Sequence, residues 1–189
     1  MGPFGAYGKI PALGDFFRVN VDPAFVDPWD RWLQSALLVG QAALGEAWQD
    51  RYLSAPIWRF TLSTGVAGPR AVQGVLMPSV DRVGRLFPLT LVTALPGRPD
   101  PRAAHGAAPF DALETLALDA LDDSMTRATL AARLAVLPNP PPTHVAAPSG
   151  LSLGVWSALL ADHTLHQITT PGLPAPSQIP ALFAPGATP

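Results

Sequence analysis

The stretch AVQGVLMPSVDRVGRLFPLTLVTAL, residues 71–95, decides the fold of this chain. It contains two apolar runs, residues 71–77 and 88–95, joined by a connection that carries three charges in five residues. Apolar runs of this length, bounded by proline and glycine, are typical of strands. We expect the second run to be buried on both faces of a sheet covered by helices, because it lacks the polar alternation of a half-buried strand.

Upstream of this stretch, the sequence predicts two strands with helices between them. Residues 4–10 are predicted to form a first strand, and residues 57–63 alternate with the period of two that suits a half-buried strand. Asp27 followed by Pro28 predicts the start of a long helix, since aspartate is a good N-cap and proline suits the first helical position. The apolar residues that follow at helical spacing are Trp29, Trp32, Leu33, Ala36 and Leu37. A second helical stretch is expected near residues 45–53.

Downstream, proline divides the chain into shorter elements, since fifteen of the 23 prolines follow residue 94. Asp111 with Glu114 predicts a capping box at the start of one helix, and leucines at helical spacing predict a second helix after Arg127. Residues 151–156 and 163–169 are predicted to be strands, and residues 179–183 a short helix.

This order of elements predicts an α/β domain, with a mixed central sheet and helices on its faces. No repeat and no long hydrophilic linker divides the chain. We expect one domain over residues 1–183 and a disordered tail over residues 184–189.

Composition excludes several classes of function. Charged residues make up only 14% of the 189 residues, against about 25% in ordinary domains, and the formal net charge is -2. We therefore expect no binding of nucleic acid or of an anionic membrane. The chain has no cysteine, which excludes disulfides and thiolate chemistry. It also shows no signal peptide and no apolar stretch of the roughly 20 residues that a membrane helix needs, so we expect a cytoplasmic protein without membrane insertion.

A search for catalytic motifs finds none of the common ones: no nucleophile elbow, phosphate loop, dinucleotide fingerprint or zinc-protease helix. His163 and His166 lie three residues apart, which places them on opposite faces of a strand, where they cannot share a metal. They could share one on a helical turn, but the segment offers no third ligand. We expect no metal site, no cofactor and no enzymatic activity.

Two segments concentrate charge and glycine against this apolar background, residues 8–18 and residues 77–88. In a structural interpretation, Asp81 satisfies turn amides and the arginines lie over aromatic surface. In a functional interpretation, Arg82 and Arg85 form a donor fork for a carboxylate or phosphate of a partner. A nucleophilic role for Ser79 would need a base that the local sequence does not supply.

The same segments carry a family resemblance. GKIPALGDF at residues 8–16, FV through WD to WLQ at residues 25–34, and GVLMPSVDRVGR at residues 74–85 followed by FPLT at residues 87–90 resemble the TagF (ImpM) family of type VI secretion-associated proteins. The resemblance implies a three-layer α/β/α sandwich. It also implies a cytoplasmic, post-translational repressor of type VI secretion that binds the forkhead-associated scaffold protein of the apparatus.

The leading hypothesis is therefore a non-enzymatic regulator that binds this scaffold through the two charged segments. Its candidate partner-binding residues are Lys9, Asp15, Phe16, Arg18, Ser79, Asp81, Arg82 and Arg85. The alternative is a small anionic-ligand or phosphate-binding domain, in its catalytic form an unrecognised hydrolase. There the same arginines would hold the anion, and Asp15 or Asp81 would act as base.

Overall fold

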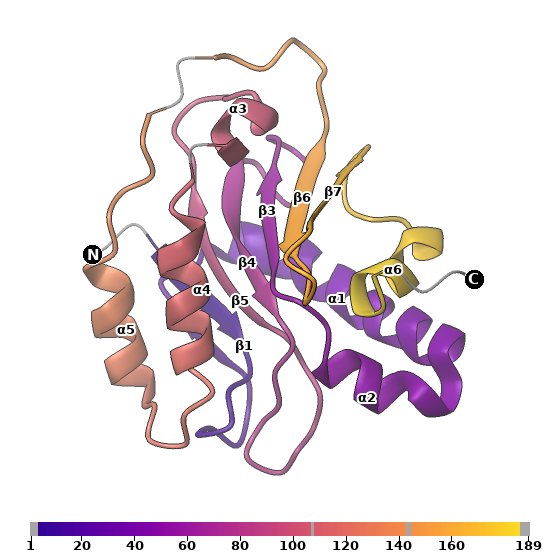
Figure 1. Ribbon diagram of the computed structural model, residues 1–189. Helices are drawn as coiled ribbons and strands as arrows, with labels where there is room; N and C mark the ends of the chain where they lie inside the picture. Colours follow the sequence, from indigo (N-terminus) through magenta and orange to yellow (C-terminus); the bar gives the residue numbers. More distant parts are fainter. Residues whose placement is uncertain (1–3, 107, 143–144, 186–189) are drawn as a thin grey trace.

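The computed structural model describes residues 4–106, 108–142 and 145–185 (Figure 1). Within them lies one seven-stranded sheet. Its strands are β1 (Phe4–Gly8), β2 (Phe17–Val19), β3 (Trp58–Leu62), β4 (Val72–Met77), β5 (Leu89–Ala94), β6 (Gly154–Leu159) and β7 (Leu165–Thr170). The helices are α1 (Pro23–Leu44), α2 (Trp48–Leu53), α3 (Pro101–Gly106), α4 (Phe110–Asp119), α5 (Arg127–Ala135) and α6 (Ile179–Phe183), with 3-10 turns at Gly45–Ala47 and Pro176–Gln178.

The strand order is β2-β1-β5-β4-β3-β6-β7, and every neighbouring pair is antiparallel. The predicted mixed sheet is therefore wrong. Uniformly apolar strands suggested a partly parallel sheet, because parallel strands are usually buried on both faces. Here an antiparallel sheet is buried on both faces at its centre, so the apolar runs report burial and not strand direction.

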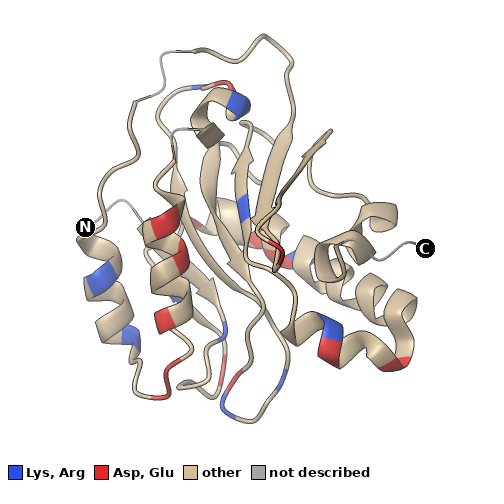
Figure 2. Cartoon of the chain, in the orientation of Figure 1, with Lys and Arg blue, Asp and Glu red and all other residues tan. Residues whose placement is uncertain are grey.

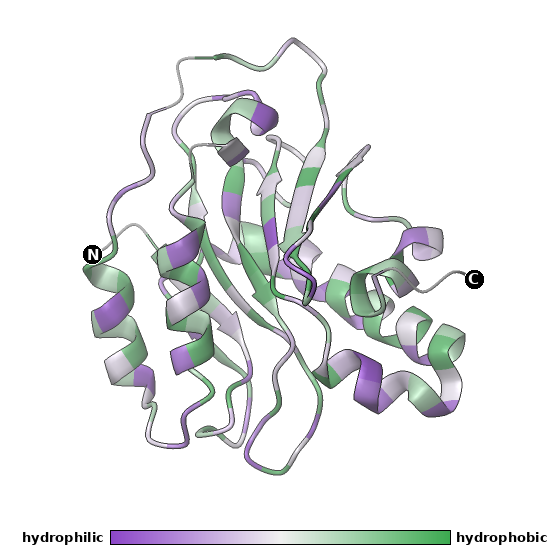
Figure 3. Cartoon of the chain, in the orientation of Figure 1, coloured by the Kyte–Doolittle hydropathy of each residue, from purple (hydrophilic) through white to green (hydrophobic). Residues whose placement is uncertain are grey.

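Alternate residues of the central strands point to two separate hydrophobic clusters. On β4, Val72 and Leu76 join the cluster that contains α1, α2 and α6, whereas Val75 and Met77 join the cluster that contains α4 and α5. Side chains that are two apart share a face of a strand, so helices cover both faces of the sheet (Figure 1). Figure 3 shows mostly hydrophobic residues along the central strands. The α/β class predicted from the sequence is confirmed.

Trp29 lies at the centre of the α1 side. It is fully buried, its ring stacks on Trp156 of β6 at 6.1 Å between centroids, and it also contacts Phe60 of β3 at 4.9 Å. Its indole N–H donates to the Thr90 hydroxyl of β5 at 2.9 Å, which satisfies the one polar atom of the ring. A single side chain of α1 therefore contacts three strands of the sheet.

The elements differ from the sequence prediction in a few places. Helix α1 begins at Pro23 rather than Pro28, because Asp22 caps it by accepting from the Ala24 amide at 2.9 Å. The capping box expected at Asp111 is wrong, since Pro109 is the N-cap of α4 and has no side-chain cap. Strand β2 and helix α3 were not predicted, because each is short and lies among glycine, aspartate or proline.

The remaining predicted strands and helices are present, with boundaries that are exact or shifted by up to three residues. Of the expected disordered tail, Ala184 is buried, and residues 186–189 lie outside the described residues. In the part of the chain that the structure describes, no helix is long and apolar enough to cross a bilayer.

Truncation of the central tryptophan tests this packing. We expect Trp29→Ala to lower the free energy of unfolding by about 4 kcal/mol, because it removes a buried ring and leaves a cavity. The exposed Leu38 on the same helix provides the control, and Leu38→Ala should change stability by less than about 0.5 kcal/mol. Urea unfolding of both variants measures the difference, and equal losses would contradict a core centred on Trp29.

Candidate functional site

The two charged segments predicted to carry function lie side by side at one end of the sheet. Strand β1 neighbours β5, and Tyr7 pairs with Thr90. The end of β1 therefore meets the start of β5, so the connection that follows β1 reaches the one that precedes β5. We call residues 9–16 and residues 78–88 together the loop pair. Figure 2 shows charged residues gathered on the connection between β4 and β5, beyond the mostly uncharged sheet.

A buried ion pair joins the two connections. The Lys9 ammonium donates to Asp81 Oδ2 at 3.0 Å, and their side chains are only 6% and 0% exposed. The ammonium also lies 4.6 Å from the centroid of the Phe16 ring, a cation–π contact. A buried charge is tolerated only when it is paired, so Lys9 requires Asp81 at this place.

Asp81 organises its own turn as well. Its Oδ1 accepts from the amides of Val83 at 3.0 Å and Arg85 at 2.9 Å, and its Oδ2 accepts from Arg85 Nε at 2.6 Å in addition to Lys9. Burial alone would raise the pKa of Asp81, but these hydrogen bonds outweigh it and hold the pKa well below its usual range. The carboxylate is thus ionised, with four donors.

The arginines tie this turn to the other connection through backbone carbonyls. Arg82 Nη2 donates to the Ala12 carbonyl at 2.6 Å, and the Arg82 amide donates to the Leu13 carbonyl at 2.9 Å. Arg85 Nη2 donates to the Gly14 carbonyl at 2.7 Å. Because these bonds cross between the two connections, the loop pair forms one unit.

Two apolar side chains of this unit are exposed. Phe16 is 47% exposed and rests on Phe87, with ring centroids 4.6 Å apart, while Val83 is 71% exposed. Val83 lies in a turn that is closed by a hydrogen bond, in which the Gly84 amide donates to the Asp81 carbonyl at 2.9 Å. Gly84 has a φ of 81°, a conformation that favours glycine. Val83 was not predicted from the sequence, although a valine between two arginines in a glycine-containing turn was an available signal.

The other candidate residues lie differently. The amide and carbonyl of Ser79 both bond to the Tyr52 hydroxyl, at 3.0 and 2.8 Å, and its buried hydroxyl has no hydrogen-bond partner among the described residues. Asp15 is exposed and accepts from the Phe16 amide at 2.8 Å. Arg18 is on β2 and lines a separate cavity near the start of α1. The structure thus brings together Lys9, Phe16, Asp81, Arg82 and Arg85, and sets Arg18 apart.

The Asp81 carboxylate is not placed to act as a general base. A general base needs a free carboxylate lone pair directed at substrate, whereas the Asp81 oxygens face four donors inside the protein. Among residues 4–106, 108–142 and 145–185, no three histidine, aspartate or glutamate side chains are grouped to hold a metal ion.

A second polar cluster lies under α3, on the face of the sheet where Arg59 of β3 pairs with Glu114 of α4. The His105 ring shares hydrogen bonds with the Thr61 hydroxyl at 3.1 Å and the Ser157 hydroxyl at 2.8 Å. Burial, and then the charge of Arg59, lower the pKa of His105 to about 4. Arg59 itself is held by Glu114 of α4 at 2.7 Å. The neutral imidazole is therefore part of the packing between α3 and the sheet.

The ion pair can be tested with a double-mutant cycle. Asp81→Ala should lower the thermal midpoint on the order of 10 °C, because it leaves the Lys9 ammonium buried without a partner. Lys9→Met should cost less than half as much, because Asp81 keeps Arg85 and the two amides. Combining both should be no worse than Asp81→Ala alone, and additive losses would show that the two side chains do not interact.

The His105 cluster predicts a pH dependence of stability. The pKa of about 4 in the folded chain is below the value of about 6.5 expected in the unfolded chain. Between these two pKa values the unfolded chain binds more protons than the folded chain. The contribution of His105 to stability is therefore fully present above about pH 6.5, and it is lost as the pH decreases toward 4. We expect this group to remove about 2 kcal/mol of unfolding free energy between pH 8 and pH 5.

Urea unfolding at the two pH values measures this loss for wild type and for His105→Gln. The variant should lose about 2 kcal/mol less than wild type over this range, since glutamine does not titrate. An identical pH slope for both proteins would overturn the assignment.

Comparison with known proteins gives the family. A family model described as the TagF N-terminal domain, type VI secretion system-associated, matches residues 5–137. The crystal structure of PA0076 from Pseudomonas aeruginosa PAO1 is similar with a TM-score of 0.87 and 32% sequence identity, covering 98% of this chain and 96% of that chain. A search of curated proteins gave no significant match. The matched residues include both connections of the loop pair, and the chain belongs to the TagF family of type VI secretion system-associated proteins.

Proposed function

We propose that this protein is a non-enzymatic, cytoplasmic regulator that represses type VI secretion after translation, by binding the forkhead-associated scaffold protein of the apparatus. Membership of a type VI secretion-associated family supports the cellular process. The observation that carries the mode of action is the loop pair, which presents exposed apolar side chains on a unit fixed by a buried ion pair.

The loop pair has the features of a protein-binding surface. Aromatic residues and arginine are enriched at binding hot spots, and here Phe16, Val83 and two arginines lie on one unit. The hydrogen bonds between the two connections fix their backbone before a partner arrives. Such preorganisation favours affinity, because less conformational entropy is lost on binding.

The arginines can serve the partner without leaving their internal contacts. A guanidinium has five N–H donors, and the described bonds of Arg82 use one of them while those of Arg85 use two. The side chain of Arg85 is 58% exposed. We therefore assign Phe16 and Val83 as apolar anchors and Arg82 and Arg85 as donors at the rim, with Lys9 and Asp81 as positioning residues beneath them.

A binding assay with the forkhead-associated scaffold protein of the same organism tests this assignment. We expect Val83→Asp and Phe16→Ser each to weaken binding at least 10-fold, because each places a polar group where an apolar anchor is buried. Val83→Asp should move the thermal midpoint by less than about 3 °C, since Val83 is 71% exposed. Phe16→Ser should lower it by about 3–6 °C, because Phe16 also packs on Phe87 and on the Lys9 ammonium, so its binding is measured at a temperature where the variant is folded.

Val136→Asp is the matched control, because Val136 is 81% exposed at the end of α5, away from the loop pair. It should bind as wild type does. If the folded loop variants also bind as wild type does, the site is wrong. If folded wild type does not bind the scaffold at all, the proposed partner is wrong.

A further inference from the structure

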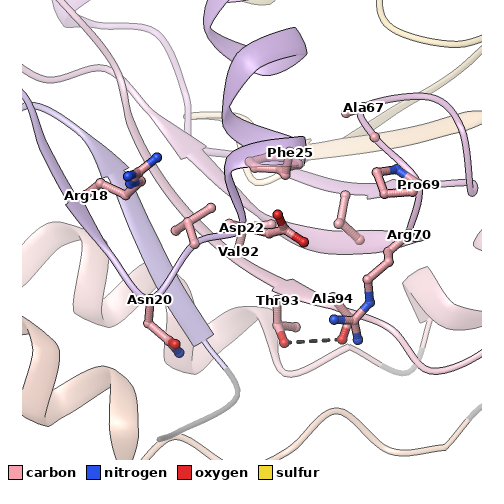
Figure 4. Close-up of a pocket in the computed structure, with 13 residues that line it drawn as sticks. Arg18, Asn20, Asp22, Phe25, Ala67, Pro69, Arg70, Val92, Thr93 and Ala94 are labelled. Carbon is pink, nitrogen blue, oxygen red and sulfur yellow. Dashed lines mark hydrogen bonds between the residues drawn. The ribbon is translucent and has the colours of Figure 1, made fainter.

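A cavity of about 460 Å³ opens beside the first turn of α1. Its walls come from the end of β2, the connection between β3 and β4, and the ends of β4 and β5 (Figure 4). Small-molecule sites typically measure about 300–1,000 Å³, so this cavity has the volume of one. It is separate from the loop pair, because none of residues 9–16 or 78–88 lines it.

The cavity is built by a close contact between two segments of the chain. Gly68 has a φ of 121°, and a Cβ placed there would lie 2.6 Å from the Ala24 carbonyl oxygen of α1. Only glycine therefore allows the connection between β3 and β4 to approach the helix this closely. The Gly65 amide, which donates to the Gly68 carbonyl at 2.9 Å, fixes the tip of the connection. The wall that carries Arg70 is thus held in place.

The lining combines an apolar floor with two arginines. Phe25, Val72 and Val92 are buried beneath the opening. Arg18 and Arg70 lie on opposite sides of it in Figure 4, with Asp22 between them. Neither guanidinium forms a hydrogen bond or an ion pair with any residue that the structure describes, whereas the Asp22 carboxylate caps the Ala24 amide.

The charge of the lining favours a negatively charged ligand. Two arginines and one aspartate leave a net charge of +1 on the lining, in a chain whose formal net charge is -2. The N-terminus of α1 adds a partial positive charge at the same place. Arginine pairs with carboxylate and phosphate through parallel hydrogen bonds. An anion with an apolar body would therefore use both parts of the lining.

We propose that this cavity binds a small organic anion, with its carboxylate or phosphate held by Arg18 and Arg70 and its apolar body against Phe25 and Val92. This site is additional to the proposed scaffold-binding surface and shares no residue with the loop pair.

Calorimetric titration of the full chain with phenyl phosphate, benzoate, benzamide and inorganic phosphate tests the proposal. We expect saturable binding of phenyl phosphate or benzoate below 10 mM, and at least 10-fold weaker binding of uncharged benzamide. Higher affinity for phenyl phosphate would indicate a phosphate site, and higher affinity for benzoate a carboxylate site. Inorganic phosphate should bind at least 10-fold more weakly than phenyl phosphate, since it lacks the apolar body.

Arg18→Gln with Arg70→Gln should weaken binding of the preferred anion at least 10-fold. Arg51→Gln with Arg102→Gln, which changes two exposed arginines outside the cavity, should leave binding unchanged. The proposal is overturned if neither aromatic anion binds saturably, if the Arg18 and Arg70 variant binds as wild type does, or if inorganic phosphate binds as tightly as phenyl phosphate. None of these results depends on binding to the scaffold protein.

Discussion

The buried ion pair between Lys9 and Asp81 is the contact on which the proposed binding surface depends. Lys9 is the chain's single lysine, and it is buried inside the protein. A buried pair of this kind contributes little net stability compared with an apolar pair of the same shape, but it is costly to break from one side. Its effect is to fix the two connections relative to each other. The positions of the arginines and of the exposed apolar side chains of the loop pair depend on that arrangement.

The sheet makes this contact possible. Strand β1 lies next to β5, so two segments about 70 residues apart in the sequence leave the sheet at the same end. The tryptophan-centred core on one face, and the α4 and α5 core on the other, hold these strands in register from both sides. The same packing brings the start of α1 against the connection between β3 and β4, where Gly68 shapes the cavity. Both proposed sites are therefore connections positioned by a rigid sheet, as is common for binding sites.

Most of the fold could be predicted from local patterns, because the strands and helices are long apolar runs with clear periods. Strand direction could not, since a central antiparallel strand that is buried on both faces has the same composition as a parallel one. At the loop pair, charge density identified the segments, and Asp81 satisfies its turn amides as the structural interpretation expected. The pairing of Lys9 with Asp81 is a tertiary contact that no local pattern encodes. Arg18 ends the first charged segment, but it lies on strand β2 and lines the cavity instead of joining the loop pair.

The central claim is that the loop pair is the surface that meets the scaffold protein. Amide hydrogen exchange of the chain, alone and saturated with the forkhead-associated scaffold protein, tests it most directly, because protection maps the contact without altering any residue. The account predicts slowed exchange in peptides that cover residues 9–16 and 78–88, and unchanged exchange in α4 and α5. Protection confined to α4 and α5, with the loop pair exchanging as in the free chain, would contradict it.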